Sequence, residues 1–263
     1  MEYKLWKMTW EEVKSSISSA NAILLPVGSM EQHGYHMTLD TDTYTSKVLA
    51  ERIAQEAQKK DIYVVVAPPL AFGVSWYHMD FPGTISFSQK TFITAVLEIL
   101  KSIHKHGYKN IIIFNSHGGN SIALQLVINL FYEQFGEIVY LAQWWEIAND
   151  ILMEIDSGYL HSEEAETSLL MYLGQRILKD KTCREAFSRE KALRKGGKST
   201  SKWIRYDGLH KGPFISLPMN RIIEISKSGV VGDAKVATIE KGEKIAETVI
   251  NRIVEICHDL GNK

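Results

Sequence analysis

The fold is decided by residues 22–34, AILLPVGSMEQHG, in which a short apolar run passes into a polar loop. The apolar part, residues 22–27, has the length and composition of a strand that is buried on both faces of a sheet. Similar runs, rich in Val, Ile or Leu, lie at 62–67, 110–114 and 137–142. The four runs predict parallel strands.

Helical segments separate these runs, at residues 42–59, about 89–106 and 121–135. A capping box at residues 9–12, TWEE, predicts a helix before the first strand, and a closing helix covers about 238–260. Strands and helices that alternate in this way form a doubly wound α/β sheet. In such a sheet, ligands bind in the crevice beyond the carboxyl ends of the strands.

The composition is that of a globular chain of 263 residues, of which 45% are hydrophobic and 23% charged. This length allows one large α/β domain or two small ones. The formal net charge of -1 gives no electrostatic reason to expect nucleic acid or an anionic membrane as a partner.

The cysteine content and the first residues bear on the location of the protein. Cys183 and Cys257 form no Cys-x-x-Cys motif, so neither a disulfide framework nor a zinc-thiolate site is expected. The first residues lack a signal-peptide pattern, and no apolar run approaches membrane-spanning length. We therefore expect a cytoplasmic protein.

Potential metal ligands crowd the end of the first predicted strand. Glu31 and His33 are two residues apart and project to the same side of an extended segment, to which Asp42 can return from the next helix. His117 follows the third run in the sequence NSHGGN, residues 115–120, whose glycines let the chain pass close to a ligand. A lone histidine after a strand is usually a hydrogen-bonded loop residue, but here it adds a fourth ligand to three others.

The sequence HSEEAETS, residues 161–168, opens an apolar helix and holds the remaining candidates. Acidic side chains in the first turn of a helix are stabilised by its free N–H groups and its dipole. Such capping is our interpretation of Glu163 and Glu164. Glu166 and His161 are instead candidates for the site itself.

Three carboxylates and two imidazoles suit two borderline cations such as Zn²⁺ or Mn²⁺, and do not suit Ca²⁺, which prefers oxygen ligands. Two such cations about 3.5–4 Å apart would share a water, lower its pKa and leave a hydroxide nucleophile. The ligand set therefore predicts a hydrolase.

Residues 176–211 break the alternation of strands and helices, with many Lys and Arg residues among few acids. We interpret them as a basic excursion from the fold. A solvated surface segment is the favoured interpretation, and a contact with a phosphate group or a partner is the alternative.

The sequence resembles the creatininase (creatinine amidohydrolase) family over most of its length. The resemblance rests on motifs in a shared order, namely GSMEQHG (28–34), TDT (41–43), FPGT (81–84), NSHGGN (115–120), EAETS (164–168) and GVVGD (229–233). It implies one creatininase-like domain over residues 1–263, with a three-layer α/β/α fold and a mainly parallel sheet. It also implies two divalent metal ions per chain and a homo-oligomer, commonly a hexamer.

The resemblance assigns the metal ligands individually. Glu31 and His117 match ligands of one metal, and His33 matches a ligand of the other. Asp42 matches the carboxylate that bridges them. Zinc is the expected metal, with manganese or iron as alternatives.

Glu166 is predicted as a metal ligand because this chain departs from the family pattern at another ligand position. Creatinine-hydrolysing members carry a further Glu ligand two places after the residue that matches His117, where this chain has Gly119. Glu166 is the expected substitute, because it lies in the shared Glu-Thr-Ser stretch.

The resemblance also gives the expected catalytic residues. His161 matches the proton-transfer residue beside the scissile bond, and Trp145 matches a pocket tryptophan.

Two further segments concern the substrate. A second pocket tryptophan, expected shortly before His161, is absent from residues 156–160, DSGYL, so creatinine is not the expected substrate. Residues 72–79, FGVSWYHM, are expected to line the pocket, with Ser75 and His78 as substrate-binding residues. A contact of His78 with a neighbouring subunit is the alternative.

Three functions remain open at this level. The first is hydrolysis of a C–N bond in a small cyclic or linear amide, by attack of a metal-bridged hydroxide on the carbonyl. The second is ring opening of an oxidised inositol (a keto-inositol) at a C–C bond. The third is a non-catalytic metal or small-molecule binding protein, which would close the coordination shell with protein atoms alone.

Overall fold

The computed structural model describes residues 1–155, 160–185 and 221–262. Its centre is a four-stranded sheet in the order β2-β1-β3-β4, and all neighbouring strands are parallel. The strands are β1 (Ala22–Val27), β2 (Val64–Val66), β3 (Ile111–Asn115) and β4 (Val139–Gln143). The four predicted strands are confirmed, although β2 is shorter than the apolar run at 62–67.

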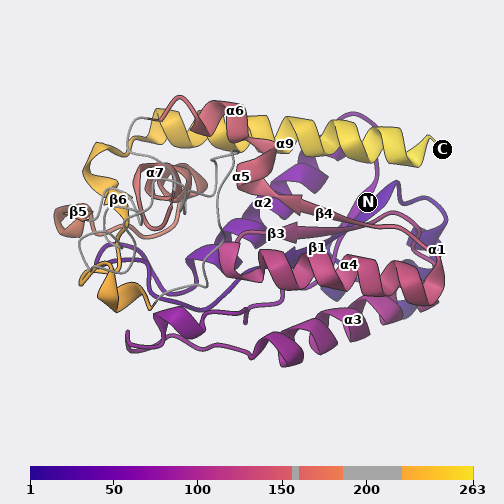
Figure 1. Cartoon of the computed structure of the whole chain (residues 1–263). Coiled ribbons are helices and arrows are strands. Elements are labelled where there is room, and N and C mark those ends of the chain that lie inside the picture. The colour runs from indigo at the N-terminus through magenta and orange to yellow at the C-terminus, as the bar shows by residue number, and fades with distance from the viewer. Residues whose placement is uncertain (156–159, 186–220, 263) are drawn as a thin grey trace.

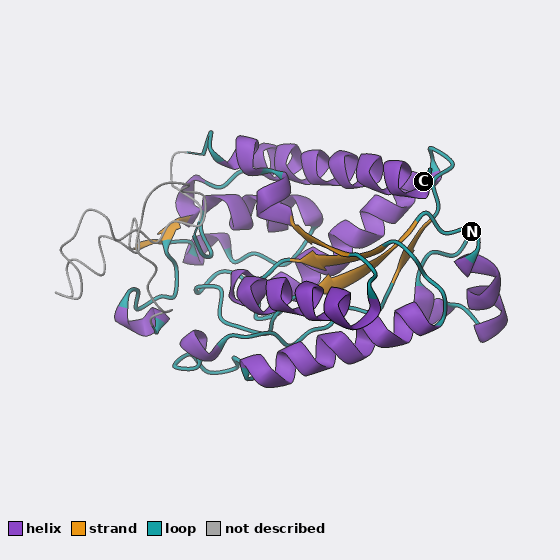
Figure 2. Cartoon of the chain, turned by 45° about the vertical axis from the view of Figure 1, so that its right-hand side comes forward, coloured by secondary structure: helices purple, strands orange, loops and turns teal. Residues whose placement is uncertain are grey.

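Helices cover both faces of this sheet, which confirms the predicted three-layer α/β/α fold (Figure 1). Helices α2 and α9 lie on one face, and α3 and α4 lie on the other, as the turned view also shows (Figure 2). The helices are α1 (Trp10–Ile17), α2 (Thr41–Gln58), α3 (Gln89–Lys105), α4 (Ser121–Phe135), α5 (Trp144–Ile147), α6 (Asn149–Leu152), α7 (Glu164–Leu173) and α9 (Ile239–Gly261).

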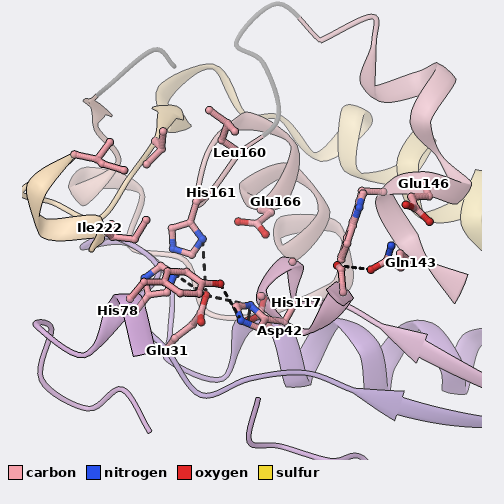
Figure 3. A pocket seen from close by; sticks show the side chains of 17 residues that line it. Glu31, Asp42, His78, His117, Gln143, Glu146, Leu160, His161, Glu166 and Ile222 are labelled. Carbon is pink, nitrogen blue, oxygen red and sulfur yellow. Dashed lines mark hydrogen bonds and ion pairs between the residues drawn. The ribbon is translucent and has the colours of Figure 1, made fainter. Parts of the chain in front are cut away.

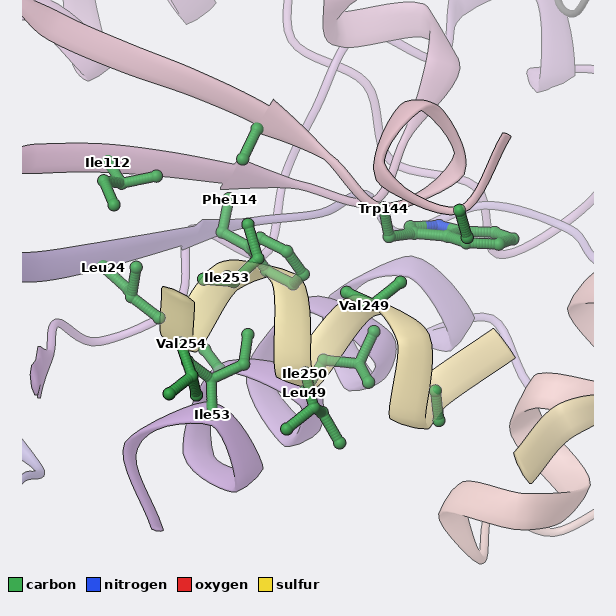
Figure 4. Close-up of a cluster of buried hydrophobic side chains, with 14 of the residues drawn as sticks. Leu24, Leu49, Ile53, Ile112, Phe114, Trp144, Val249, Ile250, Ile253 and Val254 are labelled. Atoms are coloured by element: carbon green, nitrogen blue, oxygen red, sulfur yellow. The ribbon is translucent and has the colours of Figure 1, made fainter. Parts of the chain in front are cut away.

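Two apolar cores hold the layers together, because successive strand residues point to opposite faces of the sheet. Leu24 and Phe114 pack towards α2 and α9, where Ile253 meets them (Figure 4). Ile23 and Ile113 pack towards α3 and α4. All of these side chains are fully buried, and each such burial stabilises the fold by about 1.5–3 kcal/mol.

Local sequence signals set the ends of several helices. The capping box before α1 is confirmed, since Thr9 and Glu12 cap each other's backbone N–H groups. Thr238 caps the first turn of α9 through the N–H of Lys241, so the predicted closing helix is also confirmed. Both contacts supply acceptors for N–H groups that the helix itself leaves free.

Helix α7 is held at the carboxyl-terminal end of the sheet by α9. Gly242 in α9 approaches the backbone of Ser168 in α7 so closely that a Cβ atom there would overlap it. A glycine at this crossing therefore lets the two helices pack backbone to backbone. Because α7 begins at Glu164, this packing fixes the position of the acidic cluster.

Shorter elements complete the described part of the chain. An antiparallel pair joins β5 (Arg184–Glu185) to β6 (Gly232–Asp233), and single 3₁₀ turns lie at Leu5–Lys7, Trp76–His78, Gly118–Asn120, Lys179–Lys181, Ile222–Glu224 and Ala234–Val236. Of the basic segment 176–211, residues 186–211 lie outside the described residues. None of the helices within 1–155, 160–185 and 221–262 is long and apolar enough to cross a membrane.

Candidate metal centre

A cavity of about 320 Å³ opens beyond the carboxyl ends of the strands, where the doubly wound fold predicts a ligand site (Figure 3). Its floor, formed by Glu31, Asp42, His117 and Glu166, is polar. Its walls are largely apolar and include Trp145, Leu160, Ile222 and Val231. The described residues that line it are Glu31, Asp42, Tyr77, His78, His117, Gly118, Gly119, Ser121, Gln143, Trp145, Glu146, Leu160, His161, Glu166, Ile222, Ile225 and Val231.

The loop after β1 and the start of α2 form the floor together. Gly28 lies against the backbone of Thr43, and a Cβ atom at Gly28 would overlap it. The Thr43 hydroxyl donates a hydrogen bond to the carbonyl of Ser29 at 3.0 Å. This close approach brings Asp42, the second residue of α2, beside Glu31.

The loop after β3 places His117. Its backbone N–H donates to Asn115 Oδ1 at 3.1 Å, while the Asn120 amide donates to the carbonyl of Gly28 at 3.0 Å. Asn120 Oδ1 also accepts the N–H of Val74 at 2.9 Å. Asparagine side chains thus tie the β3 loop to the β1 loop and to the segment after β2.

Asp42 lies between two imidazoles. Its Oδ1 is 3.3 Å from His33 Nε2, and its Oδ2 is 3.1 Å from His117 Nδ1. Glu31 Oε1 lies 3.3 Å from His117 Nδ1, and Glu166 Oε2 lies 4.0 Å from His33 Nε2. Three groups able to hold a metal ion result, namely Glu31, Asp42 and His117, then His33, Asp42 and Glu166, and also Glu31, His33 and His161. The first two groups share Asp42.

Each of these imidazoles is anchored through its other nitrogen. His33 Nδ1 donates to the carbonyl of Glu31 at 3.2 Å, and His117 Nε2 donates to the carbonyl of Val74 at 3.0 Å. Because a carbonyl can only accept, the nitrogen that faces Asp42 is unprotonated in the neutral ring. This arrangement orients and prepares a histidine for metal binding.

The residues fit a pair of divalent cations. Among the described residues, both carboxylate oxygens of Glu31, Asp42 Oδ2 and His33 Nε2 are buried and make no hydrogen bond of good geometry, although imidazole or carboxylate atoms lie 3.1–3.3 Å from most of them. Ligand atoms around a tetrahedral Zn²⁺ with 2.0–2.1 Å bonds lie about 3.3 Å apart, close to the spacings found here. Buried polar atoms without partners are rare in folded proteins, and a cation would satisfy these.

The pKa shifts of the buried groups also favour the binding of cations at this site. Burial by itself would lower the pKa of His33, but the carboxylates of Asp42, Glu166 and Glu31 together outweigh it and raise that pKa to about 10. His117 follows the same pattern, with Glu31 as the main carboxylate, and its pKa is about 9. Burial raises the pKa of Glu31 to about 7 and also raises that of Glu166. The buried carboxylates therefore draw positive charge into the site.

A sequence profile described as "Creatininase: Creatinine amidohydrolase" matches residues 6–257. The chain belongs to the creatininase family. It is a metal-dependent hydrolase, as the members of this family are, so the alternative of a non-catalytic binding protein is wrong.

Relatives in the creatininase family act on different compounds. The chain is 28% identical to a mycofactocin precursor peptide peptidase of Mycolicibacterium smegmatis, over 87% of this chain and 81% of the relative. It is 23% identical to a 3-dehydro-scyllo-inosose hydrolase of Thermotoga maritima (96% and 82% covered). It is also 23% identical to a creatinine amidohydrolase of Pseudomonas putida (95% and 94% covered).

Solved creatininases share the fold. A creatininase in a Mn form and a mutant creatininase of Zn-Zn type each superpose with a TM-score of 0.77, at 22% identity and 98% coverage of both chains. Manganese and zinc thus occur in proteins with this fold, and the described residues of this chain include groups able to hold such ions.

The first turn of α7 presents Glu166 to the floor. The carboxylate of Glu163 caps the helix by accepting the N–H groups of Ala165 and Glu166, as predicted. Glu164 lies in the first turn as predicted, but its carboxylate forms an ion pair with Lys241 of α9 and no capping hydrogen bond. Glu166 Oε2 accepts the N–H of Ser162 at 2.5 Å, which fixes its direction towards His33.

His161 precedes α7 and does not begin it, contrary to the prediction. It lies in an extended segment that pairs with Val231, and Ser162 then turns the chain with a left-handed φ of 55°. His161 Nε2 lies 2.9 Å from the carbonyl of Gln32, and its Nδ1 lies 3.9 Å from Glu31 Oε1. Burial, followed by the neighbouring His33, holds the pKa of His161 well below its usual value.

The other predicted pocket residues divide into two groups. Trp145 and His78 line the cavity, and His78 Nε2 lies 3.2 Å from Glu31 Oε1. Ser75 does not reach the cavity wall, because it is fully buried behind His117, 3.2 Å from His117 Nε2. Ser75 is thus not among the described lining residues, and its role in substrate binding stays a prediction.

Tyr77 explains why position 119 is a glycine. The Tyr77 hydroxyl lies 3.2 Å from His117 Nε2, and a Cβ atom at Gly119 would overlap both groups. The space that a glutamate at this position would need is thus filled.

The segment 156–159, where the second pocket tryptophan is missing, lies outside the described residues.

Several wall residues were not predicted. Ile222 and Ile225 line the cavity from a segment without a recognisable motif, and Val231 comes from the GVVGD sequence, to which no role was given. Gln143 is the last residue of β4 and accepts hydrogen bonds from Asn115 and Ser121. Only the positions of Val231 and Gln143, in a shared motif and at a strand end, could have suggested them.

We predict that Asp42→Ala abolishes tight binding of at least one cation and abolishes activity, because one carboxylate faces both imidazoles. Metal content is measured by elemental analysis after dialysis against Zn²⁺-buffered solution. Glu98→Ala, which removes an exposed carboxylate of α3, is the control and should leave the metal content unchanged. Full metal content in Asp42→Ala would refute the bridging geometry.

Proposed function

We propose that this protein hydrolyses a C–N bond in a small cyclic or linear amide, with two divalent cations bound per chain. The observation that carries the proposal is the position of Asp42, whose two oxygens face two different imidazoles at the floor of a cavity. The relative that is named a peptide peptidase supports the bond type, because a peptide bond is an amide.

The proposed ligands are Glu31, Asp42 and His117 for one cation and His33, Asp42 and Glu166 for the other. Nitrogen and carboxylate donors favour Zn²⁺, and Mn²⁺ or Fe²⁺ are the alternatives. When bound, such a pair polarises a carbonyl oxygen and lowers the pKa of a water molecule.

We assign proton transfer to Nδ1 of His161. This nitrogen faces the floor, and the low pKa of the ring leaves it unprotonated near neutral pH. It can therefore accept the proton that the attacking water loses and pass it to the leaving nitrogen, which departs as an amine while the carbonyl carbon gains a hydroxyl group. One placed histidine can serve both steps.

The walls restrict the substrate. Leu160, Ile222 and Val231 give the cavity an apolar side, and Trp145 adds an aromatic surface. Its described lining residues include no lysine or arginine, so none of them offers a permanently charged partner for an anionic substituent. A neutral amide with an apolar or planar part fits these walls, and about 320 Å³ suits a small molecule.

Ring opening of a keto-inositol is the second candidate. It is favoured by the relative that is named 3-dehydro-scyllo-inosose hydrolase, which aligns with 96% of this chain. The same floor would serve, since both reactions begin with attack of water on a polarised carbonyl.

We further propose a cytoplasmic homohexamer that acts on a small molecule and has neither nucleic acid nor a membrane as a partner. Helix α4 supports assembly, because Ile122 and Leu126 expose 78% and 47% of their surface there. Exposed apolar residues on one helix are typical of a protein interface. Light scattering should give a mass of six chains, and a monomer would contradict the hexamer.

A substrate panel tests the reaction. We expect the Zn²⁺-loaded protein to hydrolyse members of a series of lactams, formamides and short peptides, and to show little or no activity on creatinine, because Gly119 and Tyr77 alter the creatinine site. Activity on keto-inositols alone would favour the second candidate. Creatinine turnover with kcat of about 1–10³ s⁻¹ would contradict the exclusion of creatinine.

Replacement of His161 should lower kcat, whereas replacement of Glu166 should lower the metal content. His161→Ala should retain its metal and lose roughly 10²–10⁴-fold in kcat, since it removes a proton-transfer group. Glu166→Ala should lose metal. Metal stoichiometry and kcat are compared under saturating Zn²⁺, with the exposed His258→Ala as control. If His161→Ala lost metal and Glu166→Ala kept it, the two assignments would have to be exchanged.

A further inference from the structure

The side-chain amide of Gln32 connects four separate segments around the site. Its Nε2 lies 2.9 Å from His78 Nδ1, 2.9 Å from His161 Nε2 and 3.3 Å from the carbonyl of Gly229. Its Oε1 accepts the backbone N–H of Gly34 at 2.9 Å. The residue is buried, so water does not compete for these contacts.

Backbone groups fix the orientation of this amide. The N–H of Gly34 can only donate, so the amide atom that faces it must be the oxygen. The carbonyl of Gly229 can only accept, so the atom that faces it must be the nitrogen. Gly229 has a φ of 86°, and a Cβ atom there would overlap the Gln32 amide, so a glycine is required for this approach.

The fixed amide determines the proton positions on two histidines. The carbonyl of Gln32 accepts from His161 Nε2 at 2.9 Å, so this nitrogen carries a proton and cannot accept from the amide as well. The two amide hydrogens of Gln32 are then left for Gly229 and for Nδ1 of His78. Since His78 Nδ1 accepts, its proton lies on Nε2, which is 3.2 Å from Glu31 Oε1.

We propose that Gln32 is a positioning residue that fixes the tautomers of both histidines, His161 through its backbone carbonyl and His78 through its side-chain amide. His161 then presents an unprotonated Nδ1 to the cavity. His78 presents an N–H group to the carboxylate of Glu31. The use of His161 Nδ1 in proton transfer rests on the proposed function, whereas the tautomers themselves do not.

The tautomers are measured directly by ¹⁵N NMR of histidine-labelled, Zn²⁺-loaded protein. In the wild-type chain, His78 and His161 should both show a protonated Nε2 and an unprotonated Nδ1. In Gln32→Glu, a carboxylate oxygen replaces the donor that faces His78, so His78 should move its proton to Nδ1. His161 should keep its tautomer, because the backbone carbonyl of Gln32 is unchanged.

The coupling to the metal centre is measured by a double-mutant cycle. Gln32→Met keeps the length of the side chain but removes its hydrogen bonds, and it should weaken Zn²⁺ binding roughly 10–100-fold, as the loss of an outer-shell partner does. In a His78→Phe background the same change should have little further effect, because Gln32 acts on Glu31 through His78. Gln55→Met, at an exposed amide of α2, is the matched control.

The outcomes separate this proposal from the proposed function. In Gln32→Glu, a proton shift on His78 with an unchanged tautomer of His161, together with non-additive metal affinities, supports the positioning role even if no amide is hydrolysed. A wild-type His78 that carries its proton on Nδ1 overturns it, and this measurement needs no variant. Additive effects of Gln32→Met and His78→Phe on Zn²⁺ affinity also overturn it, whatever the substrate panel shows.

Discussion

The burial of the Asp42 carboxylate is the constraint on which the rest of the site depends. Burial alone would raise the pKa of Asp42, yet His33 and His117 on its two sides hold it below its usual value. A buried charge is stable only when it is paired with opposite charge and hydrogen-bonded. Two further buried carboxylates, Glu31 and Glu166, increase the demand for positive charge that divalent cations would meet.

The scaffold meets this constraint by bringing four chain segments to one end of the sheet. Parallel strands end together, so the loops after β1 and β3 are neighbours, and the hydrogen bond from Asn120 to the carbonyl of Gly28 ties them together. Helix α2 adds Asp42 because Gly28 lets its first turn approach the β1 loop, and α7 adds Glu166 because Gly242 lets α9 approach it. Glycines at two close approaches thus decide where two carboxylates lie.

Floor and walls have different parts in the chemistry. The floor groups are suited to activating water and a carbonyl, which is common to reactions as different as those named for the relatives of this chain. The walls come from segments outside the ligand motifs, such as Ile222 and Leu160. We therefore expect substrate choice to depend on these walls and on the space closed by Tyr77, since pocket contacts discriminate among substrates that share a reaction centre.

The sequence by itself determined the order of strands and helices, the fold class and the meeting of Glu31, His33, Asp42 and His117 at the floor, whereas Glu166 was assigned through the resemblance to the creatininase family. These features depend on local periodicity and on the rule that parallel strands end together, both of which can be read along the chain. It did not place Ser75 behind His117, the ion pair of Glu164 with Lys241 or the start of α7, because these features depend on contacts between residues that are distant in sequence. Only the tertiary structure decided the facing directions of Asp42 and the link from Gln32 to His78 and His161, since donor and acceptor geometry in a buried network depends on how separate segments pack.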